Sequence, residues 1–153
     1  HDDIVHFLHD QGFVVVSTID SGGYPSTACK SIVEIDPSGT LFLLDLYMGR
    51  TYANLQKNQR VCLTAIDEHK FKGFSFKGVA RIVLKKDIPE RILQLWDGKV
   101  ISRVTKRLLR NIHEEKGHSR HPEALLPHPA YMIAVDIEEV IDLTPHLLKE
   151  KET

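Results

Sequence analysis

Strand-like segments follow one another between residues 13 and 84, and short turns rich in glycine and proline separate most of them. Each segment is rich in β-branched or aromatic side chains, which favour extended backbone. Because such short turns join neighbouring strands, we expect the strands to pair in antiparallel order. The predicted strands are Phe13–Asp20, Ser26–Asp36, Leu41–Leu46, Arg60–Asp67 and Lys72–Leu84.

Glycine positions add detail to this pattern. Gly22 and Gly23, in the turn before Pro25, are free to take positive φ and predict a hairpin between the first two strands. Gly78 lies inside the fifth predicted strand, where a glycine indicates a bulge or a tight bend. A small barrel requires such bends at its corners, so we expect the strands to close into a barrel.

The segments that flank these strands are helical, apart from one closing strand. Asp2–Gln11 carries apolar residues at helical spacing. Apolar residues also recur three or four positions apart on both sides of Gly98, which predicts two amphipathic helices within residues 87–117. Tyr131–Ile137, extended by Val140–Leu143, predicts a closing strand.

These elements together predict a single domain over residues 1–153. Its core is expected at about residues 13–84, its helices at 87–117 and its closing strand at 130–144. The fold class is mainly β, an antiparallel barrel with peripheral helices packed outside it.

Composition and charge exclude several classes of partner. Hydrophobic residues make up 42% of the chain and charged residues 27%, which is ordinary for a soluble globular protein. The formal net charge is -1, so no overall field draws the chain to nucleic acid or to an acidic membrane. No apolar run approaches the ~20 residues of a membrane helix, and no signal peptide is visible. We expect a cytoplasmic protein with no nucleic-acid and no membrane partner.

The chain has two cysteines, Cys29 and Cys62, and both lie in predicted strands. They have no C-x-x-C spacing, so we interpret them as small core residues in a reducing compartment. A disulfide between them is the alternative.

The stretch from Tyr47 to Leu55 is the strongest candidate for a functional site. Gly49 permits a sharp turn after the third strand, and a short helix then begins at Thr51. The free N–H groups of a first helical turn favour an anion, and Arg50 adds a planar, permanently charged fork. These features predict a phosphate site. The alternative is an ordinary capped helix with a solvated arginine.

Several motifs around this stretch carry a family resemblance. In order along the chain they are V-V-V-S-T-I-D, G-G-Y-P, S-I-V-E-I-D, L-F-L-L-D, G-R-T-Y-A-N-L-Q-K-N-Q-R-V and F-S-F-K-G-V-A-R-I. The basic residue and threonine, followed by Asn54, Leu55 and N-x-R-V, are the most specific part. This pattern resembles the pyridoxamine 5'-phosphate oxidase-like superfamily of FMN-binding, Greek-key split barrels. The resemblance covers about residues 13–84.

The resemblance implies a cofactor site and an oligomeric state. The FMN phosphate would be held by Arg50 and Thr51. Backbone contacts to the ribityl chain or ring would come from the end of the third strand, at Asp45, Leu46 and Tyr47. Polar atoms at the ring edge would come from the second strand, at Ala28, Cys29, Lys30 and Ser31. Members of this superfamily are usually homodimers with FMN at the subunit interface, and a small barrel filled by its own side chains also needs walls from elsewhere.

The resemblance further implies an FMN-dependent oxidoreductase acting on an unidentified small molecule. True pyridoxamine 5'-phosphate oxidases end in an arginine-rich segment with a tryptophan, which V-I-D-L-T-P-H-L-L-K-E-K-E-T lacks, so their activity is not expected here. No residue is assigned a catalytic role, and no nucleophile–base arrangement is visible. The alternatives are a flavin-binding electron carrier or sensor, the same barrel binding a deazaflavin or haem, and a nucleic-acid-binding barrel.

Three individual side chains allow two interpretations each. Lys30 either faces solvent or faces the cleft, where its ammonium would stabilise negative charge on a reduced flavin ring. Asn54 is expected to fix the start of the helix rather than to touch a ligand. Trp96 is expected in the core or an interface rather than stacked on a flavin.

Two polar clusters in the second half receive a structural interpretation. The first cluster consists of the histidines His113, His118, His121 and His128. We favour a solvated lid over a metal or haem site for them, because prolines interrupt the backbone between them. A solvated helix face is favoured over nucleic-acid binding for the basic residues Arg103, Lys106, Arg107 and Arg110. We predict no metal site.

Overall fold

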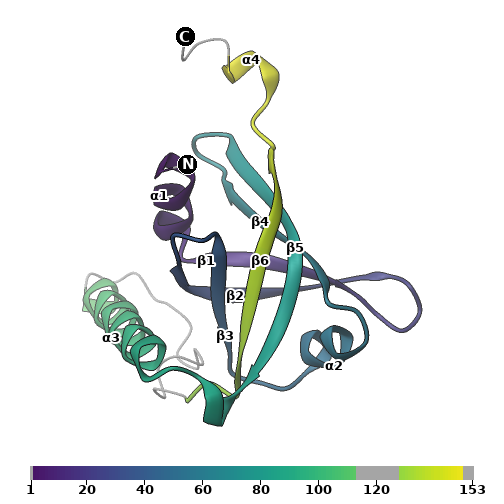
Figure 1. Ribbon diagram of the computed structural model, residues 1–153. Helices are drawn as coiled ribbons and strands as arrows, with labels where there is room; N and C mark the ends of the chain where they lie inside the picture. The colour runs from purple at the N-terminus through teal and green to yellow at the C-terminus, as the bar shows by residue number, and fades with distance from the viewer. Residues whose placement is uncertain (1, 113–127, 150–153) are drawn as a thin grey trace.

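The computed structural model describes residues 2–112 and 128–149 (Figure 1). Its elements follow the predicted order closely. The helices are α1 (Asp2–Gln11), α2 (Arg50–Lys57), the single 3-10 turn η1 (Lys85–Asp87), α3 (Glu90–Ile112) and α4 (His146–Lys149). The strands are β1 (Phe13–Ile19), β2 (Pro25–Ile35), β3 (Thr40–Asp45), β4 (Arg60–Asp67), β5 (Lys72–Leu84) and β6 (Tyr131–Asp142).

The six strands form a closed antiparallel barrel in the order β1-β2-β3-β6-β5-β4. The chain leaves the sheet after β3, passes through α2 and returns as β4, which pairs with β1. The last strand, β6, fills the remaining gap between β3 and β5. The predicted fold class, a mainly β barrel with peripheral helices, is confirmed, and the closed six-stranded barrel is consistent with a split barrel.

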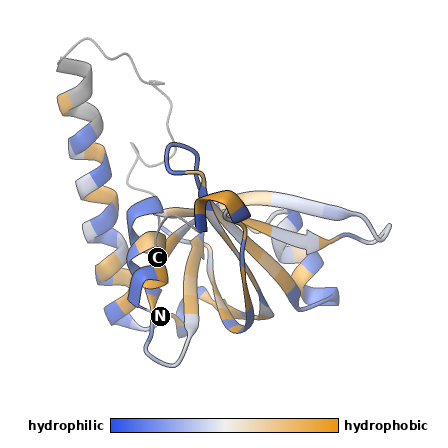
Figure 2. Cartoon of the chain, turned by 90° about the horizontal axis from the view of Figure 1, so that it is seen from above, coloured by the Kyte–Doolittle hydropathy of each residue, from blue (hydrophilic) through white to orange (hydrophobic). Residues whose placement is uncertain are grey.

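Two apolar clusters account for the packing. The first fills the barrel with inward-facing side chains that alternate along the strands, such as Val14, Val16, Ile32, Leu41, Leu43 and Ile133. The second lies under α3 and contains Ile92, Trp96 and Val100. The prediction that Trp96 belongs to the core is therefore confirmed. Figure 2 shows the barrel strands largely apolar and α3 striped with apolar and polar residues, as expected of a helix that covers one side of a barrel.

The prediction of two helices divided at Gly98 is wrong. Residues Glu90–Ile112 form one continuous helix, α3, and Gly98 lies inside it. A glycine inside a helix costs roughly 1 kcal/mol relative to alanine. The burial of Trp96 and Val100 on either side of Gly98 offsets this local cost, because each apolar side chain contributes about 1.5–3 kcal/mol when fully buried. Among the described helices, none is long and apolar enough to cross a membrane.

The predicted irregularity at Gly78 is confirmed. The register between β5 and β6 shifts between Lys77 and Gly78, as in a β-bulge. A Cβ atom placed on Gly78 would collide with the backbone carbonyl oxygen of Asp136 on the neighbouring strand. Glycine is therefore required here by close backbone approach.

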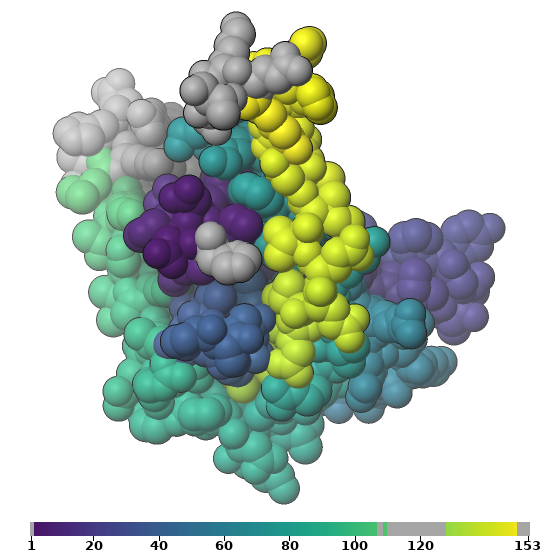
Figure 3. Space-filling model, turned by 45° about the horizontal axis from the view of Figure 1, so that its top comes forward, coloured from purple at the N-terminus to yellow at the C-terminus, as the bar shows by residue number. Residues whose placement is uncertain are grey.

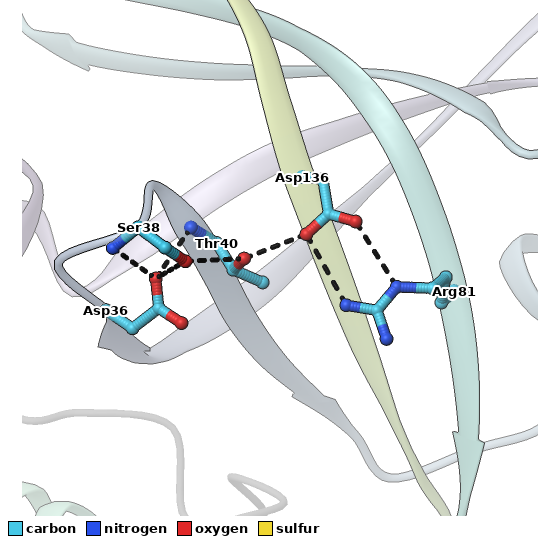
Figure 4. A network of polar contacts seen from close by, with 5 residues as sticks. All are labelled: Asp36, Ser38, Thr40, Arg81 and Asp136. Atoms are coloured by element: carbon cyan, nitrogen blue, oxygen red, sulfur yellow. Dashed lines mark hydrogen bonds and ion pairs between the residues drawn. The ribbon is translucent and has the colours of Figure 1, made fainter.

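The start of β3 is joined to β6 and β5 by a polar network (Figure 4). Asp36 accepts hydrogen bonds from the Ser38 hydroxyl and from the Thr40 backbone N–H. The Thr40 hydroxyl donates to Asp136 at 2.8 Å, and Asp136 also pairs with Arg81. The Thr40 hydrogen bond, followed by the hydrogen bonds of Arg81, holds the pKa of Asp136 below its ordinary value.

The two glycines give a matched pair of substitutions. Gly78→Ala is expected to lower the free energy of unfolding by about 1–3 kcal/mol, because the new methyl group has to displace backbone. Gly98→Ala is expected to raise it by roughly 0.5–1 kcal/mol, since no atom lies within 4 Å of the added Cβ. Urea unfolding followed by circular dichroism measures both values. Equal effects of the two substitutions would contradict the bulge.

The Thr40–Asp136 hydrogen bond predicts a pH-dependent contribution to stability. The pKa of Asp136 is lower in the folded than in the unfolded chain, so the contribution is present above the unfolded value of about 3.9 and is lost as the pH falls through the folded value. Thr40→Val is expected to cost about 1 kcal/mol at pH 7. Urea unfolding at pH 7 and near pH 3 should show this difference shrinking in acid, and a constant difference would refute the link to Asp136.

Candidate functional site

A cavity of about 450 Å³ lies where β3 passes into α2, against the first half of β2. The β1–β2 hairpin projects from the barrel beside α2 (Figures 1 and 3). Residues of both elements line the cavity. Its lining consists of Asp20, Pro25, Ser26, Thr27, Ala28, Lys30, Asp45, Tyr47, Gly49, Arg50 and Thr51. The cavity thus brings together six of the residues that the sequence marked as candidates: Ala28, Lys30, Asp45, Tyr47, Arg50 and Thr51.

The N-terminus of α2 opens onto this cavity without a side-chain cap. Gly49 is the N-cap residue and offers no side chain, and the first backbone bond of the helix runs from the Ala53 N–H to the Gly49 carbonyl. The three preceding N–H groups, of Arg50, Thr51 and Tyr52, have no partner within the helix. The alternative of an ordinary helix capped by a side chain is therefore wrong for α2.

Arg50 supplies the cavity with a positive charge that has no ion-pair partner among the described residues. Within the described part of the chain, its exposed guanidinium makes no hydrogen bond or ion pair. The nearby carboxylate of Asp20 is occupied by its own turn, where it accepts the N–H groups of Gly22 at 2.8 Å and Tyr24 at 2.9 Å. An anion that enters the cavity therefore meets a guanidinium, free helix N–H groups and the Thr51 side chain.

A buried ion pair forms the inner wall of the cavity. The Lys30 ammonium lies 2.6 Å from Oδ2 of Asp45, and the two side chains are 14% and 5% exposed. Of the two orientations considered for Lys30, the structure has the one that faces the cleft. Asp45, expected to offer only backbone contacts, contributes its carboxylate to the wall instead.

Tyr131 of β6 lies behind this wall and supports it. Its hydroxyl donates to the same Asp45 oxygen at 2.8 Å, and its side chain is fully buried. Burial, followed by the hydrogen bond to Asp45, raises the pKa of Tyr131 far above its ordinary value, so the phenol remains a hydrogen-bond donor. Sequence analysis missed this residue, which lies 86 positions from Asp45 and has no local signal.

Two contacts hold α2 against the barrel. The Asn54 amide donates to the Thr18 hydroxyl of β1 at 3.0 Å in a buried hydrogen bond. The ring of Tyr52 packs edge-on against Tyr131, with centroids 5.0 Å apart. Asn54 does not line the cavity, and rather than fixing the start of the helix it fixes the helix to β1.

Three of the candidate residues have side chains that lie outside the cavity. Cys29 is exposed on the outer face of β2, and Ser31 accepts a hydrogen bond from Arg103 of α3 at 2.9 Å. Leu46 packs with the cluster under α3. On β2 the strand period of two explains this, because Cys29 and Ser31 alternate with Lys30 and with Ala28, which line the cavity. Because Cys29 is exposed, the prediction of a core position is wrong for this residue. Both Cys29 and Cys62 are free thiols, so the alternative of a disulfide between them is also wrong.

The described members of the two polar clusters of the second half do not line this cavity. His113, His118 and His121 lie outside the described residues, and His128 is exposed. Among the residues that the structure describes, no three histidine, cysteine or acidic side chains are placed to hold a metal ion. Arg103 is not simply solvated, since it donates a hydrogen bond to Ser31 and lies over the ring of Phe13. The side chains of Arg107 and Arg110 are not among those that the structure describes.

Comparisons with known proteins cover most of the chain, including this cavity. The family model described as pyridoxamine 5'-phosphate oxidase matches residues 1–140. No curated protein sequence matches the chain.

Solved structures share the fold at low sequence identity. A pyridoxamine 5'-phosphate oxidase-related, FMN-binding protein from Nostoc punctiforme has a TM-score of 0.58 at 14% identity, covering 93% of this chain and 82% of its own. HutZ, the heme storage protein from Vibrio cholerae, has a TM-score of 0.55 at 16% identity, covering 92% of each chain. A protein from Clostridium acetobutylicum related to general stress protein 26 has a TM-score of 0.61 at 18% identity, covering 96% of this chain and 95% of its own.

Proposed function

Because this chain belongs to the pyridoxamine 5'-phosphate oxidase family, we propose that it binds FMN in the cavity beside α2 and acts as an oxidoreductase through that cofactor. The observation that carries the proposal is the exposed Arg50 guanidinium beside the uncapped N-terminus of α2. A dianionic phosphate complements both features, since the helix N–H groups and the guanidinium are donors only.

The residues of the cavity fit the whole cofactor tail. Arg50 and Thr51, together with the first N–H groups of α2, would hold the phosphate. The projecting hairpin offers small and polar side chains at Ser26 and Thr27, which suit a hydroxylated chain. Ala28 and Lys30 lie further along the same face of β2, toward the ion pair with Asp45, and would meet the ring.

When bound, FMN supplies hydride or electron transfer at its ring, and the protein supplies binding, orientation and charge. Lys30 places a cation at the inner wall, and Tyr131 stays protonated behind it. These groups tune the cofactor rather than attack a substrate. The chemistry that fits is therefore transfer of hydride or electrons through the flavin from one small molecule to another.

A second copy of the chain would supply the missing walls of the ring site. The cavity is open, and a flat tricyclic ring is normally buried on most of its surface. Apolar side chains lie exposed on the outer face of the neighbouring strands β1 and β4, among them Val15, Ile19 and Ile66. Exposed apolar surface of this kind marks interfaces. A homodimer with FMN at the interface satisfies both requirements.

Haem is the second candidate, because HutZ, a heme storage protein, shares this fold. Among the described residues that line the cavity, only Tyr47 is of a type that ligates haem iron. Titrations of the purified protein with FMN, riboflavin and haemin separate the two candidates. FMN is expected to bind much more tightly than riboflavin, which lacks the phosphate. Equal affinities for FMN and riboflavin, or tighter binding of haemin, would overturn the proposal.

Arg50→Ala is expected to weaken FMN binding by roughly a hundredfold or more. Charge-assisted hydrogen bonds contribute about 1.5–3 kcal/mol each, and a guanidinium makes two to a phosphate. Fluorescence titration with FMN measures the loss. Lys57→Ala, on the last turn of the same helix and outside the cavity, should leave the affinity unchanged. Riboflavin affinity should be the same in all three proteins.

Val15→Asp is expected to convert the homodimer into a monomer and to weaken FMN binding tenfold or more. A charge on the outer face of β1 has to be desolvated if that face is covered by a second copy. Light scattering after size exclusion measures the mass. Leu148→Asp on α4 is the control, because Leu148 and Val15 are 38% and 37% exposed. A dimer that survives Val15→Asp would place the interface elsewhere.

A further inference from the structure

The Lys30–Asp45 pair joins a buried carboxylate to a largely buried ammonium, and it borders the proposed cofactor site. Both side chains line the cavity, and both are largely removed from solvent. A buried ion pair adds little net stability, since the desolvation of two charges cancels most of their attraction. Apolar side chains would fill the same wall at no loss of stability, so stability alone does not account for the pair.

Asp45 is fixed on both of its carboxylate oxygens. Oδ2 forms the ion pair with the Lys30 ammonium at 2.6 Å and accepts a hydrogen bond from the Tyr131 hydroxyl at 2.8 Å. Oδ1 faces the backbone N–H of Tyr47 at 3.4 Å. Tyr131 is itself fully buried and packs against Tyr52 of α2. The carboxylate therefore has one position, and it draws the ammonium to one position.

The Lys30 ammonium has donors to spare. An ammonium carries three N–H groups, and in the described part of the chain Lys30 has one partner, the carboxylate of Asp45. The lysine side chain is also the more exposed of the two, at 14% against 5% for Asp45. An occupant of the cavity thus meets the positive end of the pair first.

We propose that Asp45 and Tyr131 are positioning residues that hold the Lys30 ammonium against the flavin ring, and that this pair sets the ratio of affinities for reduced and oxidised FMN. The inference rests on the proposed FMN site. Reduction makes the ring electron-rich, so a nearby cation favours the reduced form and a nearby anion disfavours it. In a partly buried site these effects are larger than in water.

The test measures dissociation constants for oxidised FMN and, under anaerobic dithionite, for reduced FMN. Lys30→Gln removes the charge yet still donates to Asp45, and it is expected to weaken reduced FMN relative to oxidised FMN about tenfold, or about 30 mV for a two-electron couple. Asp45→Asn removes the opposing charge, and it is expected to shift the ratio the other way. Tyr131→Phe removes the hydrogen bond that stabilises the Asp45 charge. It should therefore shift the affinity ratio in the same direction as Lys30→Gln, but by a smaller factor.

Lys30→Arg is the matched control, because it keeps the charge and should hold the ratio within about threefold of wild type. Potentials from spectroelectrochemistry should agree with the affinity ratios. Shifts of the same sign in Lys30→Gln and Asp45→Asn, which general loosening would produce, overturn the inference, as do unchanged ratios. Wild-type protein that binds no FMN overturns the proposed function and this inference together. Tight, Arg50-dependent FMN binding with unchanged ratios overturns this inference alone.

Discussion

Closure of the sheet by β6 is the constraint on which the rest of the structure depends. This strand pairs with β3 on one side and with β5 on the other, so no edge is left open and each strand has one inner face. The inner face carries Ile32, Leu43 and Ile133 in the middle of the barrel. Lys30, Asp45 and Tyr131 lie two residues further along the same three faces. Closure therefore brings three polar side chains from three distant segments to one end of the barrel.

The helix α2 completes that end of the barrel and leaves its own N-terminus exposed. Leu55 is buried in the barrel core and Asn54 bonds to β1, so the position of the helix is fixed by its later turns. Its first turn receives no cap, because Gly49 has no side chain to offer. Its free N–H groups and the unpaired guanidinium of Arg50 are therefore exposed together, and both favour an anion. The packing of α2 thus leaves an electropositive corner at the cavity.

The limits of prediction from sequence follow from the range of each interaction. The strands and the bulge at Gly78 were predictable, because a period of two and a glycine within a strand are local signals. The continuity of α3 through Gly98 was not, since burial of Trp96 decided it. The period of two also could not say which face of β2 carries the cavity, and so Cys29 and Ser31 were grouped with Ala28 and Lys30. Tyr131 needed the closed barrel before it could be linked to Asp45.

Three of the four charged side chains that line the cavity, Arg50 and the Lys30–Asp45 pair, have different physical roles. Arg50 is exposed and unpaired among the described residues, so in the proposed FMN site its interaction with the phosphate would not depend on the redox state of the distant ring and would contribute to affinity alone. Lys30 and Asp45 are buried and neutralise each other, so they contribute little to overall attraction. Their dipole nevertheless points its positive end at the cavity, where in the proposed FMN site it would distinguish an electron-rich ring from an electron-poor one. In that site, residues on α2 would set the affinity for the cofactor and residues at the end of the barrel would set its potential.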